Sequence, residues 1–167
     1  ANFGPALSLS EADEKALWRV NYQAPIRLIK QVAERNRKIR LVQLSSLAAL
    51  CPHPYLAAYS ASKAALQTYC LALQEELRLK GSEVTVCCYI LGPVQTAIFP
   101  PELQDALGGS QLQMSPEIAA RRIIRLLQQG CSYAIVGKRY RLLAWLMKLL
   151  PQRWIIRLIG AYLRKGL

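Results

Sequence analysis

Apolar residues recur every three or four positions along the first part of the chain, which is the spacing of one helical face. The segment 10–38 starts with Ser10 as an N-cap, followed by acidic residues in the first turn. Pro25 lies within this segment, and proline lacks a backbone donor and clashes with the preceding turn. The pattern therefore predicts a long helix that is kinked or broken close to Asn21.

Two further segments have the same helical periodicity. Residues 55–80 are rich in alanine and are followed by Gly81, which is suited to a helix C-terminus. Residues 115–130 begin with Ser115 as an N-cap and Pro116 in the first helical position. Both segments are therefore predicted to be helices.

Three short runs are apolar without that periodicity, which is typical of buried strands. They are residues 39–46, 83–90 and 132–137, and the second is nearly all apolar, as expected of a strand covered on both faces. Helices and strands thus alternate along the chain, which favours an α/β fold with a parallel sheet and crossover helices. Because three strands make a narrow sheet, we interpret the fold as part of a larger doubly wound domain.

Basic residues are concentrated towards the C-terminal end. The formal net charge is +12, and residues 138–167 contain eight Lys and Arg residues and no acidic residue. Leu, Ile and Trp fill the other positions of this segment, and Pro151 divides it into two short amphipathic helices. We therefore expect an α/β domain over residues 1–137 and a basic, amphipathic helical tail over residues 138–167.

The apolar runs of the tail are too short to cross a bilayer, which requires roughly twenty residues. One interpretation is that the tail lies on an anionic membrane surface, with Trp145, Trp154 and Tyr162 at the interface. The alternative, of equal weight, is that its apolar face packs on the body of the protein or on a second subunit. Nucleic acid is a poorer fit, because the charges alternate with bulky aliphatic side chains.

The five cysteines form no CxxC pair and lie mostly in apolar segments, so the sequence indicates neither a disulfide framework nor a zinc site. A reducing, cytoplasmic location is the simpler interpretation of this cysteine usage. The tail adds the alternative of a location peripheral to a membrane.

Tyr59 and Lys63 lie four residues apart in the predicted helix 55–80, so their side chains share one helical face. An ammonium group close to a phenol lowers the pKa of the phenol, and such a tyrosine can give a proton to a carbonyl or take one from an alcohol. With eight tyrosines and eight lysines in the chain, the spacing also arises by chance, and a solvated lysine beside a packed tyrosine is the plain alternative. Ser46, at the end of a predicted strand, strengthens the interpretation as a site.

The segment LVQLSSLAALCPHPYLAAYSASKAAL resembles the short-chain dehydrogenase/reductase family in the spacing of its Ser, Tyr and Lys. Three other segments resemble family motifs in the same order. VNYQAP resembles the helix segment that carries a catalytic Asn, ANFG resembles an Asn-Asn-Ala-Gly turn, and LGPVQT resembles a Pro-Gly-x-Val-x-Thr segment. The resemblance implies a Rossmann-type doubly wound parallel sheet, of which this chain would be the C-terminal part.

The same resemblance implies a catalytic tetrad. Tyr59 would transfer the proton, and Lys63 would lower the pKa of Tyr59 and contact the ribose of the cofactor. Ser46 would hydrogen-bond the substrate oxygen, with Ser45 as its nearest rival, and Asn21 would hold a water molecule that links Lys63 to solvent. The implied reaction interconverts a carbonyl and an alcohol on a small molecule with NAD or NADP.

Further residues are implied to contact NAD or NADP. The backbone of Val94 would meet the nicotinamide amide, Gly92 would allow a close approach, and Thr96 would contact the amide or the pyrophosphate. Asn2 and Gly4 would lie on the adenosine side of the cleft.

The sequence departs from the family pattern in several places. Leu91 replaces a proline, and Ala1 and Phe3 replace the usual Asn and Ala of the turn. None of the nine glycines forms a GxxxGxG pattern after a strand, although a nicotinamide cofactor needs a glycine-rich cradle for its pyrophosphate. We therefore expect a C-terminal fragment of a longer reductase, which holds the catalytic residues and by itself binds the cofactor poorly.

Weaker signals concern the substrate and the partners. Family analogy places residues 95–115 over the substrate, and Ile98, Phe99 and Leu103 favour an apolar one. His53 is expected to be a surface loop residue, because no Ser-His-Asp arrangement accompanies it. The alanine-rich face from Ala57 to Ala65 would let another helix approach closely, which suggests a homo-oligomer. A non-catalytic peripheral membrane or scaffold protein with the same fold is the alternative to an enzyme.

Overall fold

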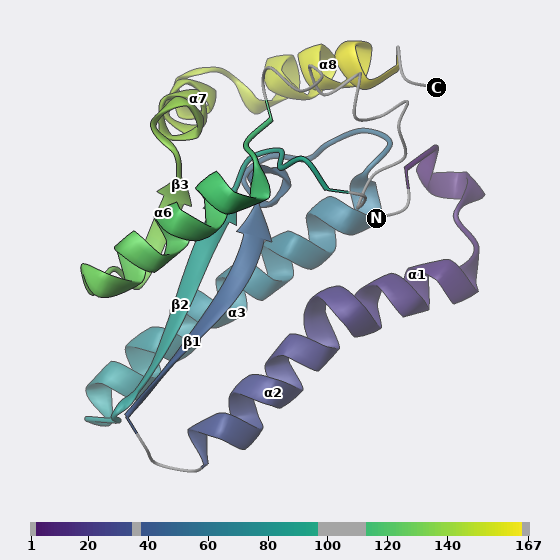
Figure 1. Ribbon diagram of the computed structural model, residues 1–167. Helices are drawn as coiled ribbons and strands as arrows, with labels where there is room; N and C mark the ends of the chain where they lie inside the picture. Colours follow the sequence, from purple (N-terminus) through teal and green to yellow (C-terminus); the bar gives the residue numbers. More distant parts are fainter. Residues whose placement is uncertain (1–2, 35–37, 97–112, 165–167) are drawn as a thin grey trace.

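The computed structural model describes residues 3–34, 38–96 and 113–164 of the chain. A three-stranded parallel sheet lies at its centre in the order β1-β2-β3, with helices on both faces (Figure 1). The strands are β1 (Ile39–Ser46), β2 (Val84–Leu91) and β3 (Tyr133–Val136). The helices are α1 (Glu11–Trp18), α2 (Ala24–Ala33), α3 (Ala57–Leu79), α6 (Pro116–Gln128), α7 (Lys138–Leu149) and α8 (Gln152–Leu163). The shorter elements are two 3-10 turns, Ala6–Ser8 and Leu47–Ala49, and a π-helical turn, Arg19–Gln23.

The strand positions confirm the α/β fold with a parallel sheet. Each observed strand lies within one residue of its predicted limits. β1 pairs with β2 from Ile39 opposite Val84 to Ser46 opposite Leu91, and Leu91 in turn lies opposite Val136 of β3. The carboxyl ends of all three strands therefore meet at one edge of the sheet.

The kink or break expected near Asn21 takes the form of a π-helical turn, and the chain stays helical from α1 to α2. In the π-helical turn between α1 and α2, Ala24 donates its backbone N–H to the carbonyl oxygen of Arg19, five residues back. Pro25 has no N–H, so it cannot give the carbonyl of Asn21 a regular α-helical hydrogen bond. Asn21 thus lies in the irregular turn, and its side chain reaches α3.

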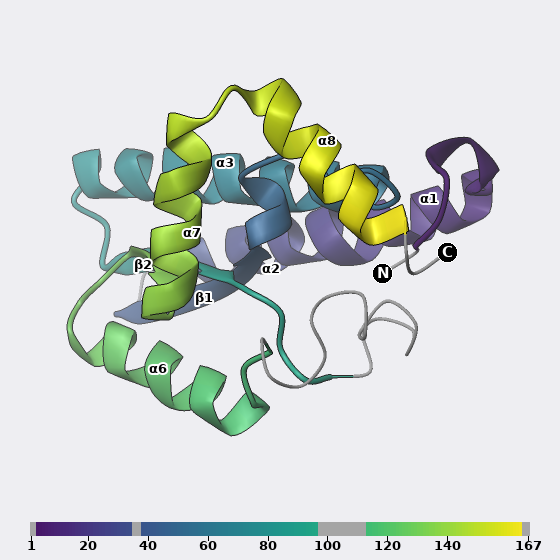
Figure 2. The same ribbon diagram turned by 90° about the horizontal axis from the view of Figure 1, so that it is seen from above.

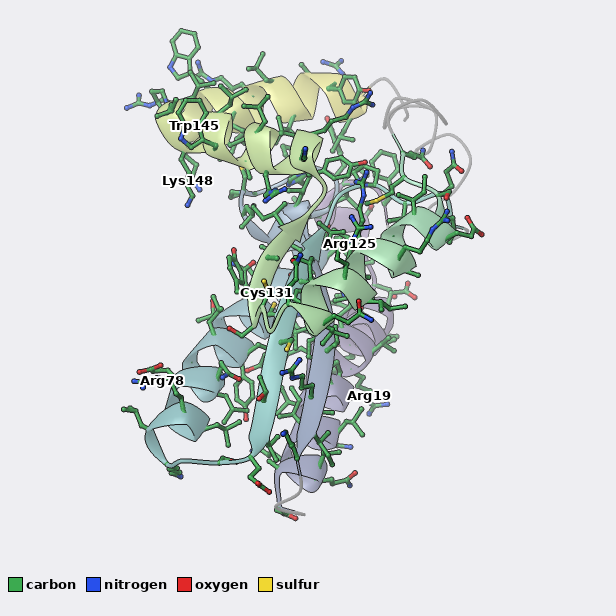
Figure 3. All side chains as sticks on the ribbon, turned by 60° about the vertical axis from the view of Figure 1, so that its left-hand side comes forward. Arg19, Arg78, Arg125, Cys131, Trp145 and Lys148 are labelled. Atoms are coloured by element: carbon green, nitrogen blue, oxygen red, sulfur yellow. The ribbon has the colours of Figure 1, made fainter. Side chains whose placement is uncertain are left out.

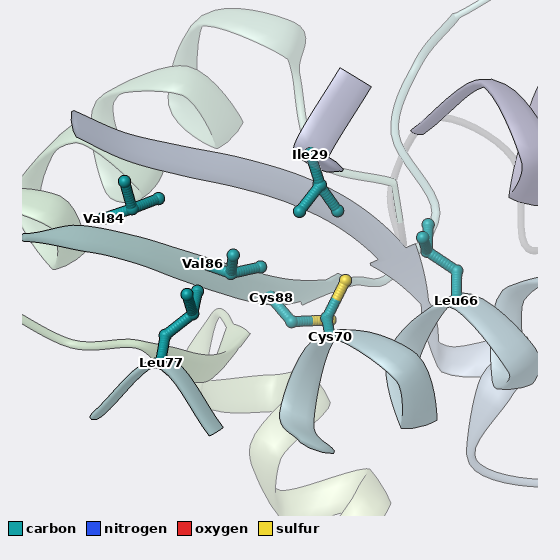
Figure 4. Packing of buried hydrophobic residues seen from close by; sticks show 7 residues of the cluster. All are labelled: Ile29, Leu66, Cys70, Leu77, Val84, Val86 and Cys88. Atoms are coloured by element: carbon teal, nitrogen blue, oxygen red, sulfur yellow. The ribbon is translucent and has the colours of Figure 1, made fainter. Parts of the chain in front are cut away.

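The two faces of the sheet are buried by different helices. On one face, a core cluster joins α2, α3 and β2 (Figure 4). Its members are Ile29, Leu66, Cys70, Leu77, Val84, Val86 and Cys88. The other face is covered by α6, whose Ala119 packs with Tyr89 of β2. β2 is therefore covered on both sides, as its nearly continuous apolar sequence predicts.

The two C-terminal helices lie beyond the carboxyl ends of the strands and pack on the α/β body (Figure 2). Ala144 of α7 is buried, and Leu163 of α8, only 1% exposed, packs against Tyr59. α8 also comes close at Gly160, where an added Cβ would lie 3.1 Å from Cγ of Pro54. One apolar stripe of the basic tail therefore belongs to the core of the protein. Over the described ranges, no helix has the length and apolar character needed to cross a membrane.

The seating of α8 can be tested with a matched pair of substitutions on that helix. Leu163→Ala removes a side chain that is 1% exposed, so we expect the free energy of unfolding to fall by about 2–5 kcal/mol. Leu158→Ala changes a side chain that is 63% exposed, and we expect a change within about 0.5 kcal/mol. Urea unfolding followed by circular dichroism measures both. Equal effects of the two substitutions would contradict the packing of α8 on the body.

Candidate active site

A cleft of about 810 Å³ lies at the carboxyl ends of β1 and β2. In open α/β sheets this edge is the usual place for a ligand, because loops and helix starts surround it. Six of the residues predicted to act on the substrate or cofactor line the cleft. They are Ser46, Tyr59, Lys63, Gly92, Val94 and Thr96.

Tyr59 and Ser46 both line the cleft, and the Ser46 hydroxyl acts to lower the pKa of the Tyr59 phenol. Tyr59 lies in the first turn of α3, and Ser46 is the last residue of β1. The oxygen Oγ of Ser46 also accepts the backbone N–H of Ala48 at 3.2 Å, which fixes the serine rotamer. Ser45, the rival candidate, instead donates its hydroxyl to the backbone oxygen of Lys63 at 3.2 Å. Of the two serines, Ser46 is therefore the one whose hydroxyl meets the phenol.

Lys63 lies one helical turn after Tyr59, on the same side of α3. Its amino nitrogen Nζ is 6.0 Å from the centre of the Tyr59 ring and donates a hydrogen bond to the backbone oxygen of Leu44 at 3.0 Å. Burial lowers the pKa of Lys63, and the negative charge of a nearby Cys88 thiolate would partly oppose this effect. The β1 carbonyl and the Ser45 hydroxyl together fix this part of α3 against the sheet.

The acidity of Tyr59 differs from the sequence-based expectation. Burial raises the pKa of Tyr59 above its usual value, and the hydrogen bond from Ser46 opposes this only in part. The phenol is 6% exposed, because Leu17, Leu56 and Leu163 pack around it. The pKa of Tyr59 is therefore raised, and not lowered by Lys63 as the sequence led us to expect. Tyr59 carries its proton at neutral pH, which suits a group that gives a proton to a carbonyl oxygen.

Asn21, in the π-helical turn between α1 and α2, contacts α3. Its side-chain nitrogen Nδ2 donates to Oγ of Ser62 at 3.1 Å, and the Ser62 hydroxyl donates to the backbone oxygen of Tyr59 at 2.7 Å. Asn21 is thus tied to the turn of α3 that holds Tyr59 and Lys63. The water link from Asn21 to Lys63 stays a prediction.

The close approach expected at Gly92 is made by a residue of α7. A Cβ atom on Gly92 would lie 2.4 Å from the ring of Tyr140, whose hydroxyl donates to the backbone oxygen of Pro93 at 3.2 Å. The missing side chain of Gly92 therefore makes room for Tyr140. Contact between Gly92 and a cofactor stays a prediction.

The other predicted cofactor residues that the structure describes lie in two places. Val94 pairs with Met114, and its carbonyl oxygen accepts the Thr96 hydroxyl at 3.4 Å. Gly4 donates its N–H to the oxygen of Tyr55 at 3.0 Å and borders a separate, smaller pocket. Asn2 lies outside the described residues. So do the three apolar residues that were taken to favour an apolar substrate, Ile98, Phe99 and Leu103.

Two parts of the cleft wall were not expected from the sequence. His53 is half-buried and lines the cleft, and Nδ1 of its ring lies 2.7 Å from the oxygen of Cys51. Burial lowers the pKa of His53, so its ring is neutral at pH 7. The C-terminal helices supply the rest of the wall, including Leu146 and Ile155. The periodic apolar face of the tail was the signal for this role, but it does not say which surface that face meets.

The environment of Tyr59 predicts its titration. We expect Tyr59 to ionise at higher pH than free tyrosine, and Ser46→Ala to raise its pKa further, because the lost hydrogen bond favours the phenolate. The pKa of Tyr59 in the folded protein lies above its pKa of about 10 in the unfolded chain. The contribution of this group to the free energy of unfolding is therefore complete below the pKa of the unfolded chain, and it is lost as the pH rises through the pKa of the folded protein. Carbon-13 tyrosine NMR measures the titration, with Tyr59→Phe to assign the signal. A Tyr59 pKa at or below the usual value would contradict the structure.

Comparison with known proteins gives a family-level match. A family model described as short chain dehydrogenase matches residues 1–106. A short-chain dehydrogenase of Penicillium ochrochloron is 29% identical over 170 residues, covering 89% of this chain and 61% of that protein. The chain thus spans about three-fifths of the length of the curated relatives that it matches over most of its own length.

Solved structures share the fold. A short-chain dehydrogenase of Burkholderia cenocepacia J2315 in complex with NADP has a TM-score of 0.73 at 21% identity, covering 95% of this chain and 64% of that one. A short-chain dehydrogenase/reductase of Burkholderia phymatum in complex with NAD has a TM-score of 0.70 at 18% identity, covering 89% and 62%. The α/β architecture with its parallel sheet is therefore that of these proteins.

Proposed function

Because this chain belongs to the short-chain dehydrogenase family, we propose that the protein is an oxidoreductase that interconverts a carbonyl and an alcohol with NAD or NADP. The observation that carries the proposal is that Tyr59 and Ser46 line one cleft at the carboxyl end of the sheet, where the serine hydroxyl acts on the pKa of the phenol. Lys63 on the same face of α3 supports it. A buried tyrosine that meets a serine hydroxyl in a cleft is placed to exchange a proton with a bound oxygen atom.

The proton moves between the Tyr59 hydroxyl and the substrate oxygen. In reduction, the Ser46 hydroxyl positions the carbonyl oxygen, and Tyr59 gives this oxygen its proton as the carbonyl carbon receives a hydride. When bound, the nicotinamide cofactor would supply that hydride. The raised pKa of Tyr59 keeps the phenol protonated before the reaction, which favours reduction near neutral pH. Oxidation of an alcohol reverses both transfers.

The residues present fit the nicotinamide and ribose part of the cofactor. The bridge between Val94 and Met114 uses the N–H groups of Gln95 and Met114, so it does not consume the N–H of Val94. Lys63 has three N–H donors, one of which meets the Leu44 oxygen, so others can reach a ribose hydroxyl. A glycine-rich cradle for the pyrophosphate does not occur in the sequence, and the binding of that group is not assigned to residues of this chain.

The cleft favours a substrate with an apolar part. Leu47 and Ile123 line it together with Leu146, Met147 and Ile155 of the C-terminal helices. Such walls stabilise a ligand by removing apolar area from water, at about 25 cal/mol per Å². The reacting carbonyl would lie at the polar end, next to Ser46 and Tyr59.

The mechanism is tested by two separate variants, each of which removes one tyrosine hydroxyl from α3. Tyr59→Phe removes the proposed proton donor, and we expect the rate of NAD(P)H-dependent carbonyl reduction to fall at least about 100-fold. Tyr69→Phe makes the same change ten residues along the helix, where the ring pairs edge-to-face with Tyr22, and we expect activity close to wild type. Cofactor oxidation followed by absorbance measures both.

Two results would count against this proposal. If the Tyr59→Phe variant reduces carbonyl compounds as fast as wild type does, the assigned proton donor is wrong. If wild type binds NAD(P)H and keeps its fold but reduces no member of a panel of aldehydes and ketones, the non-catalytic alternative is favoured.

A further inference from the structure

The outer side of the C-terminal helices exposes large apolar side chains. Trp145 and Leu149 of α7 are 57% and 61% exposed, and Trp154 and Leu158 of α8 are 62% and 63% exposed. Figure 3 shows Trp145 and Lys148 on the outer side of these helices. Single exposed apolar residues are normal, but several on two adjacent helices form a patch that marks an interaction surface.

The same helices carry a strong positive charge. Residues 138–164 contain seven Lys and Arg residues and no acidic residue. All seven are exposed, and the two ion pairs that the structure describes, Lys15–Glu11 and Arg78–Glu75, lie on other helices. The patch therefore combines exposed tryptophan and leucine with cations that have no carboxylate on their own segment. Its partner must be apolar and anionic at once.

The patch is continuous with the wall of the catalytic cleft. Leu143, Leu146 and Leu150 of α7 line the cleft and are still 46%, 44% and 51% exposed. Leu158 of α8 does the same at 63%. A side chain that both lines a cleft and faces solvent lies at its mouth. An apolar path therefore leads from the outer surface of α7 and α8 into the cleft that holds Tyr59.

We propose that α7 and α8 dock on the surface of an anionic lipid bilayer, with the mouth of the cleft towards the lipid. The substrate is then a carbonyl compound or alcohol dissolved in that bilayer, which enters without crossing water. The substrate assignment rests on the proposed oxidoreductase function, whereas the docking surface does not.

Charge decides between a membrane and a second copy of the chain. Two copies related by a two-fold axis would bring the same patch, and hence the same cations, face to face. An anionic bilayer neutralises those cations, accepts leucine side chains in its outer acyl region and favours tryptophan at the level of the headgroups. The lengths of α7 and α8, twelve residues each, suit helices that lie along the surface.

Vesicle flotation tests the docking surface with the full-length protein. We expect binding to vesicles of phosphatidylcholine with phosphatidylglycerol, and little binding to phosphatidylcholine alone. Trp145→Glu combined with Trp154→Glu should weaken binding at least about tenfold, and Arg153→Gln and Arg157→Gln about fivefold each. Leu79→Glu combined with Leu7→Glu is the matched control, because it adds the same two charges at positions that are 71% and 101% exposed and lie outside α7 and α8, and it should leave binding unchanged.

Several results would overturn the proposal. They are equal binding by wild type and the double tryptophan variant, no binding to anionic vesicles, and a dimer in sedimentation that the tryptophan substitutions dissociate. The last result would assign the patch to a second copy. Circular dichroism checks that each variant keeps its fold.

The substrate class is tested by two carbonyl compounds, a long-chain aldehyde held in anionic vesicles and a short, water-soluble aldehyde. We expect the double tryptophan variant to lose most of its reduction of the vesicle-borne aldehyde, at least about tenfold, and to keep its rate with the soluble one. Equal loss with both substrates, or no loss with either, would refute entry from the bilayer. A wild-type protein that floats with the vesicles and binds NAD(P)H but reduces neither aldehyde would contradict the proposed oxidoreductase function and leave the docking surface standing.

Discussion

The burial of one phenol ring links most of the structure described above. Tyr59 lies in the first turn of α3, lines the cleft with Ser46 from the end of β1, and is covered by Leu163 from the far end of the chain. Removing the ring from water raises the pKa of its hydroxyl, and the serine hydrogen bond offsets this only in part. Sheet, central helix and C-terminal helix must therefore all be in place before the phenol has the environment that a proton donor requires.

Two groups of contacts hold that arrangement. Lys63 and Ser45 attach α3 to β1 through backbone oxygens, which sets the height of the helix on the sheet. Asn21 approaches from the irregular turn before Pro25 and reaches the backbone of Tyr59 through Ser62. Each contact is polar and lies next to the apolar core, where an unpaired partner costs about 1–3 kcal/mol. The same residues that surround the site therefore also fix its geometry.

Local features of the sequence were sufficient for the elements and for much of the site. Short apolar runs without helical periodicity predicted each strand within one residue, and the chemistry of Pro25 predicted an irregularity of the helix at Asn21. Contacts between distant segments could not be predicted in this way. The raised pKa of Tyr59 depends on Leu163, and the space at Gly92 is filled by Tyr140 of α7. Periodicity shows that a helix has an apolar face, but not which surface that face will meet.

Gly160 has a consequence for how the site can vary. The helix α8 passes so close to Pro54 that a single methyl group at residue 160 would come within 3.1 Å of the proline ring. A methyl group there would require α8 or the Pro54 ring to shift by a few tenths of an ångström, and α8 also carries the Leu163 that covers Tyr59. The burial of the Tyr59 hydroxyl, which raises its pKa, is thus linked through α8 to a position that does not line the cleft. The hydrogen atom in place of a side chain at Gly160 is what lets α8 lie this close to Pro54.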